Sequence, residues 1–116
     1  KIETRPRSHL YIRDLLAEAP IPARGILSQT LSDDEDVRVV VFSFAAGEEL
    51  SEHTAARPAI VHILSGEGEV EAEGEVHQAA GGSWLRMDAG TSHAIRARSG
   101  MVMALYLLPR RESPEG

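Results

Sequence analysis

The chain contains no cysteine, which excludes disulfides, thiolate metal ligands and a cysteine nucleophile. Any metal would therefore have to bind His, Asp or Glu. No apolar run approaches the roughly 18 residues of a membrane span, and the opening stretch KIETRPRSHLY lacks the apolar region of a signal peptide. We therefore expect a soluble, cytoplasmic protein with no membrane partner.

Basic residues are also scarce, since 12 Lys and Arg stand against 18 Asp and Glu and give a formal charge of -6. This balance disfavours binding to a phosphate backbone, so we expect no nucleic-acid partner. A chain of 116 residues suits one domain that buries its own core.

Most of the sequence consists of short strand-like runs separated by glycine turns. We expect strands at residues 26–31, 37–44, 50–55, 60–64, 83–87, 93–98 and 101–108. Between the fourth and fifth of these, Glu69, Glu71 and Glu73 alternate with apolar residues, which is typical of a strand that is wet on one face. Such a pattern predicts an antiparallel sandwich or barrel.

One short helix is expected near the start of the chain. Ser8 could cap residues 10–19, which Pro20 and Pro22 would end. The apolar side chains Tyr11 and Leu15 recur at helical spacing, so we expect this helix to pack on the domain.

Two glycine-anchored histidines carry a resemblance to a known family. Gly47, His53 and Gly66 fit the first motif of the small single-domain cupins (cupin 2, conserved β-barrel), and Gly82, Gly90 and His93 fit the second at the right intervals. The resemblance implies an all-β fold, namely a cupin-type antiparallel β-barrel (jelly roll). We expect an N-terminal arm and short helix over 1–22, the barrel over 23–109 and a polar tail over 110–116.

The first motif is divergent. Ala55 stands where the family has its second histidine, and Ala59 stands where it has a glutamate. Two of the four usual metal ligands implied by the resemblance are therefore missing. The stretch EHTAARPAIVHIL also resembles a cupin subgroup with H-T-A in place of H-T-H, which is mostly of unassigned function.

Strand alternation places His53 and His93 on inward faces, in agreement with the motif. For His62 two registers stay open. A hairpin about Arg57 and Pro58 would set His62 directly opposite His53, whereas strict alternation from an inward residue 59 would turn it away. A bulge or a one-residue change in the turn decides between them.

Three neutral imidazoles would suit a divalent transition metal (Zn, Fe, Ni, Cu or Mn). The predicted metal site is therefore His53, His62 and His93, in a protein that is either a metal-dependent enzyme, such as an oxygenase or isomerase acting on a small organic molecule, or a non-catalytic or metal-free barrel that binds a small ligand. His77 is expected at the surface, with a fourth ligand or a lip residue as the alternative. The resemblance further implies a homodimer.

Overall fold

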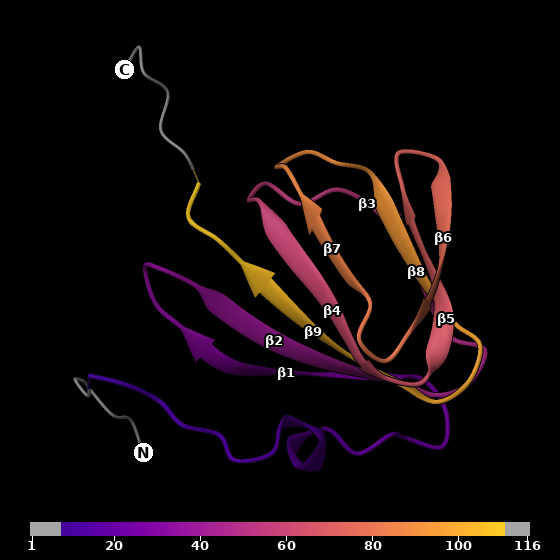
Figure 1. The fold of residues 1–116 in the computed structure, drawn as a ribbon, viewed down its shortest axis with the longest axis horizontal. Helices are drawn as coiled ribbons and strands as arrows, with labels where there is room; N and C mark the ends of the chain where they lie inside the picture. The colour runs from indigo at the N-terminus through magenta and orange to yellow at the C-terminus, as the bar shows by residue number, and fades with distance from the viewer. Residues whose placement is uncertain (1–7, 111–116) are drawn as a thin grey trace.

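The structure, a computed structural model, describes residues 8–110 and consists almost entirely of β-strands (Figure 1). Each predicted strand range overlaps a strand, although the bounds differ by one or two residues. In chain order, the elements within the described residues are η1 Leu15–Glu18, β1 Ile26–Asp33, β2 Arg38–Phe44, β3 Glu49–His53, β4 Ala59–Ser65, β5 Glu67–Ala72, β6 Glu75–Ala80, β7 Trp84–Met87, β8 His93–Ala97 and β9 Met101–Leu107.

The strands form two antiparallel sheets. Sheet A has the order β1-β2-β9-β4-β7, and sheet B has the order β3-β8-β5-β6. Successive strands repeatedly cross from one sheet to the other, as a jelly roll requires, and Figure 1 shows sheet B set against the β4 and β7 side of sheet A. The predicted all-β, jelly-roll fold is confirmed.

The inner faces of the two sheets enclose an apolar core. Alternation along each strand sends every second side chain into it, as Ala59, Val61 and Ile63 do from β4. The core comprises Phe44, Ala59, Val61, Ile63, Val70, Ala79, Met87, Ile95, Ala97, Met101 and Met103.

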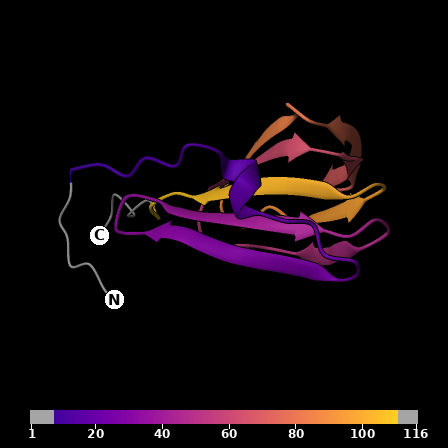
Figure 2. The same cartoon turned by 90° about the horizontal axis from the view of Figure 1, so that it is seen from below.

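The outer face of sheet A is partly covered by the N-terminal segment. Ala19 and Leu15 pack there against Val41 of β2 and Val102 of β9, and Figure 2 shows this segment crossing sheet A. As a result β2 is buried on both faces, as the apolar run 37–44 predicted.

The expected helix over residues 10–19 is wrong in length, because only a four-residue 3-10 turn forms. Its cap is Asp14 and not Ser8, since the Asp14 carboxylate accepts a hydrogen bond from the Leu16 N–H at 3.1 Å. Leu15 packs on the domain as expected, whereas Tyr11 is 76% exposed. Within residues 8–110, no helix has both the length and the apolar character needed to span a membrane.

Candidate functional site

Two histidines meet at one end of sheet B. His53 ends β3, His93 begins β8, and the two residues are paired directly across the antiparallel strands. Their ring centroids lie 4.2 Å apart with the ring planes tilted by 56°. His93 is only 6% exposed, while His53 is open to solvent. The pair therefore lies at the rim of the barrel, with one ring inside and one accessible.

A β-bulge aims His53 toward His93. Leu50 pairs with Ile95 and His53 pairs with His93, so β3 uses one more residue than β8 over the same stretch. Strict alternation would place residues 50 and 53 on opposite faces, whereas the bulge brings both onto the inner face. The predicted inward orientation of His53 is found, but it depends on this irregularity.

Both imidazoles are held by hydrogen bonds to backbone carbonyls close in sequence. The Nδ1 of His53 lies 2.8 Å from the Ser51 carbonyl oxygen, and the Nδ1 of His93 lies 3.0 Å from that of Thr91. A carbonyl oxygen can only accept, so each Nδ1 carries the hydrogen. The Nε2 of each neutral ring then keeps its lone pair, which is the state a metal requires.

The loop before His93 is anchored on both sides. Ser92 donates its hydroxyl hydrogen to the Glu52 carboxylate, and its N–H donates to the Glu73 carboxylate at 2.8 Å. The Gly90 N–H donates to the Ala55 carbonyl at 2.9 Å. These bonds link the segment that carries His53 to the segment that carries His93.

The structure does not bring His62 to this pair. The expected hairpin between residues 53 and 62 is wrong, because β3 and β4 belong to different sheets and His62 pairs with Trp84 of β7 and Ala104 of β9. Since Ala59, Val61 and Ile63 face the core, His62 faces away from it. The alternative register, with residue 59 inward, is the one that forms.

The donor set at the rim fits a metal with two ligands. At a metal–nitrogen distance of about 2.1 Å, two imidazoles on one ion would have ring centres roughly 4.5–5 Å apart, close to the observed 4.2 Å. Ala55 and Ala59 offer no donor side chain, and among residues 8–110 no group of three His, Cys, Asp or Glu side chains is placed to share an ion. Most coordination positions would be left to water or a ligand.

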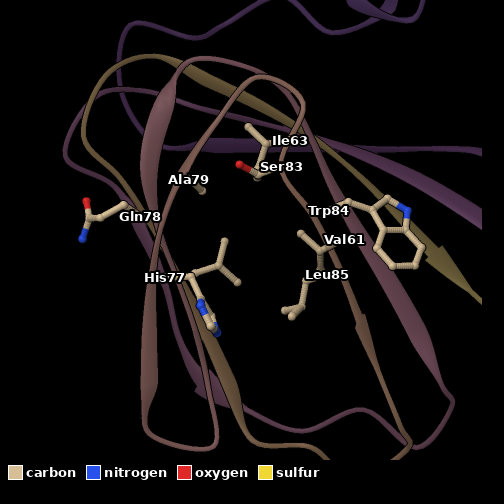
Figure 3. A pocket seen from close by; sticks show the side chains of 9 residues that line it. Val61, Ile63, His77, Gln78, Ala79, Ser83, Trp84 and Leu85 are labelled. Atoms are coloured by element: carbon tan, nitrogen blue, oxygen red, sulfur yellow. The ribbon is translucent and has the colours of Figure 1, made fainter.

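A separate cavity of about 290 Å³ opens between β6 and β7 (Figure 3). Its walls are mostly apolar, and His77 of β6 lies at its edge, on the same strand face as the buried Ala79. His77 is exposed, as the sequence predicts, and its place at the edge of the cavity is that of a lip residue. Alternation alone could not reveal the cavity, because both faces of β6 carry apolar and polar residues.

Two arginines near the ends of β3 and β7, Arg57 and Arg86, have structural partners. The Arg57 guanidinium donates to the carbonyls of Leu108 at 2.9 Å and Leu107 at 3.1 Å, which ties the loop after β3 to the end of β9. Arg86 forms an exposed ion pair with Asp88 at 3.4 Å. Neither contact points to a ligand.

The fold and the rim together define a small jelly-roll barrel with a paired imidazole centre. Residues 40–108 match the cupin domain family, and the chain belongs to that family. This confirms the resemblance that the two glycine–histidine motifs carry.

Solved structures agree with this assignment. A conserved protein of unknown function from Streptococcus pyogenes is 32% identical with a TM-score of 0.79, and the match covers 91% of this chain and 93% of that one. A cupin superfamily protein from Desulfitobacterium hafniense is 25% identical over 94% and 98% of the two chains, with a TM-score of 0.73. The TT1209 protein of Thermus thermophilus shares the fold at 20% identity and a TM-score of 0.78, over 88% and 100%. No curated protein matches the chain.

Proposed function

We propose that this cupin binds a small organic molecule at a divalent transition metal held by His53 and His93. The observation that carries the proposal is the state of the two rings: they lie 4.2 Å apart, and each Nδ1 is hydrogen-bonded to a carbonyl. Each Nε2 is therefore free to ligate. Zn, Fe, Ni, Cu and Mn all accept neutral imidazole.

The surroundings of the rings suggest what the chain itself contributes. His93 is buried and fixed by an anchored loop, so it would set the position of the ion, while the exposed His53 leaves a path from solvent. A bound metal would supply Lewis acidity to a ligand oxygen or to water. Oxygenase or isomerase chemistry on a small organic substrate suits a centre with several open positions.

A metal-free small-ligand-binding barrel is the second candidate function. Ala55 and Ala59 favour it, because they replace two of the four ligands that the cupin motif usually supplies, and Ala59 is fully buried in the core. Two imidazoles alone hold a metal more weakly than the three protein ligands typical of catalytic zinc sites.

Metal content of untagged protein, measured by elemental analysis after incubation with each of the five metals and gel filtration, separates the two functions. His53→Ala and His93→Ala test the pair. His62→Ala is the matched control, since it removes an imidazole from the outer face of sheet A. We expect near-stoichiometric metal in the wild type and His62→Ala, and little in the other two variants.

Equal metal retention in all four proteins would place the ion elsewhere and would overturn the proposal. The absence of metal from the wild type under every condition would favour the metal-free barrel.

A further inference from the structure

The barrel is open along one seam. β6 is the last strand of sheet B and β7 is the last strand of sheet A, and a short turn joins them. The turn is anchored to β4 of sheet A, because the Ile63 N–H donates to the Ser83 carbonyl at 2.9 Å and the Gly82 N–H donates to the Ile63 carbonyl at 2.8 Å. Beyond the turn the two strands diverge (Figures 1 and 3).

The cavity described above, of about 290 Å³, fills this opening, and we call it the seam cavity. Its apolar lining comes from Val61, Ile63, Val70, Ala79 and Leu85. Figure 3 shows His77, Val61 and Leu85 facing one another across it. The volume lies near the lower end of the range of about 300–1,000 Å³ for small-molecule sites, so it suits a compact apolar group.

Three polar side chains also line the seam cavity, those of His77, Gln78 and Ser83. The Gln78 amide is already hydrogen-bonded to Glu69 and Arg98, whereas within residues 8–110 no hydrogen bond holds the His77 ring. In the part of the chain that the structure describes, β6 pairs only with β5 and β7 only with β4, so each strand also turns one edge of its backbone toward the seam. An apolar floor with a few convergent polar groups is the usual composition of a ligand site.

The negative charge near the seam cavity indicates which polar group a ligand could carry. The Glu75 carboxylate lies 3.8 Å from the Nε2 of His77, and the chain has a formal charge of -6. A ligand carboxylate would be repelled here, whereas a carbonyl or hydroxyl oxygen could accept a hydrogen bond from the imidazole without that penalty.

We propose that the seam cavity is a binding site for a compact, neutral, largely apolar molecule with one oxygen acceptor, which His77 recognises by a hydrogen bond. Neither His53 nor His93 lines this cavity. The inference therefore does not rest on the proposed metal centre.

The test uses acetophenone as the probe, with ethylbenzene as the analogue that lacks the oxygen and benzoate as the charged analogue. Methyl NMR spectra of the full chain are recorded in EDTA during titration. We expect saturable shifts confined to the methyls of Val61, Ile63, Val70 and Leu85. Binding of ethylbenzene should be about three- to tenfold weaker, as expected for the loss of one hydrogen bond, and benzoate should also bind more weakly.

Variants locate the probe. Leu85→Trp, which fills the cavity, should abolish the shifts. His77→Leu should weaken the binding of acetophenone three- to tenfold and leave the affinity for ethylbenzene unchanged. Val76→Ala, on the outer face of the same strand, is the matched control. His93→Ala should bind the probe as the wild type does, which separates this site from the metal centre.

Shifts spread evenly over the protein, no shift up to millimolar probe, or full binding by folded Leu85→Trp would each overturn the proposal. Equal affinities for acetophenone and ethylbenzene would remove the role of His77. Thermal melting of each variant identifies any that fails to fold, in which case Ala79→Leu replaces Leu85→Trp as the cavity-filling change.

Discussion

Ser92 donates its hydroxyl hydrogen to Glu52, and these residues directly precede His93 and His53 in the chain. The hydrogen bond thus joins the two backbones that present the imidazoles. Because the Thr91 carbonyl that orients His93 lies in the same anchored loop, a disturbance at residue 92 should reach the ring.

We therefore expect Ser92→Ala to weaken metal binding about tenfold, the lower end of the effect of removing an outer-shell partner. Ser51→Ala, which keeps the carbonyl that orients His53, is the control. Titration calorimetry with Zn²⁺ measures both affinities. Equal affinities for the two variants would show that the Glu52–Ser92 bond does not position the site.

A third imidazole should strengthen the centre. Ala55→His restores the residue that the cupin motif usually has, so we expect metal affinity at least tenfold above that of the wild type. Ala56→His, on the exposed neighbouring residue, adds the same group outside the motif position. The same calorimetric titration compares them, and an equal gain in both would indicate nonspecific binding by added histidine.

Of the two glycines of the first motif, Gly66 is predicted to be the more sensitive to substitution. Gly66 has a φ of +89°, and a Cβ there would overlap with the Gly100 carbonyl oxygen. Gly47 has a similar φ of +87° but open space around it. Gly47→Ala should lower the free energy of unfolding by about 1 kcal/mol, because an L-residue is strained in the left-handed backbone conformation. Gly66→Ala should lower it by at least twice as much. Urea unfolding measures both, and equal losses would contradict the packing argument.

Stability should fall in acid through Glu69 on the outer face of sheet B. The pKa of its carboxyl lies below the usual 4.5, first because Gln78 donates a hydrogen bond to it and then because Arg96 does so at 3.0 Å. A depressed pKa in the folded state stabilises the protein above the unfolded value, and this contribution is lost as the pH falls below about 4.5 and through the folded value.

Urea unfolding between pH 3 and 7 tests this expectation. Glu69→Gln should flatten the loss of stability on the acid side, whereas Glu67→Gln, at the exposed start of the same strand, should leave the profile unchanged. Identical profiles for wild type and Glu69→Gln would exclude a role for this carboxyl.

We also propose a homodimer. Trp84 and Leu27 lie at opposite edges of the outer face of sheet A and are 59% and 52% exposed. Burying such apolar side chains against a second copy would favour association. Sedimentation should give twice the 12.6 kDa chain mass. Trp84→Ser should shift the equilibrium toward monomer, and a wild-type monomer at high concentration would contradict the expectation.

The strands could be predicted because alternation and glycine turns are local signals. Pairing between strands is not local, and the connection between His53 and Ala59 illustrates the difference. A short loop with Arg57 and Pro58 is typical of a hairpin, yet here it carries the chain from sheet B to sheet A. The prediction that His62 joins His53 and His93 fails because it assumes that hairpin.

The two inward histidines could be anticipated from the motif, but the reason that His53 faces inward could not. Its orientation depends on a bulge after Leu50, which strict alternation along the sequence does not reveal. The seam cavity was missed for a related reason. It arises where the edge strands of two sheets separate, and neither strand sequence alone records that separation.

The pairing of His53 with His93 also bears on how the protein folds. The two residues are distant in the chain and become neighbours only when β3 docks on β8, a non-local contact of the kind that forms slowly. An ion that needs both imidazoles would bind only after this docking, so it would stabilise the native state by mass action and slow local opening of the rim. The rate of metal uptake during refolding would then report the rate at which the barrel closes.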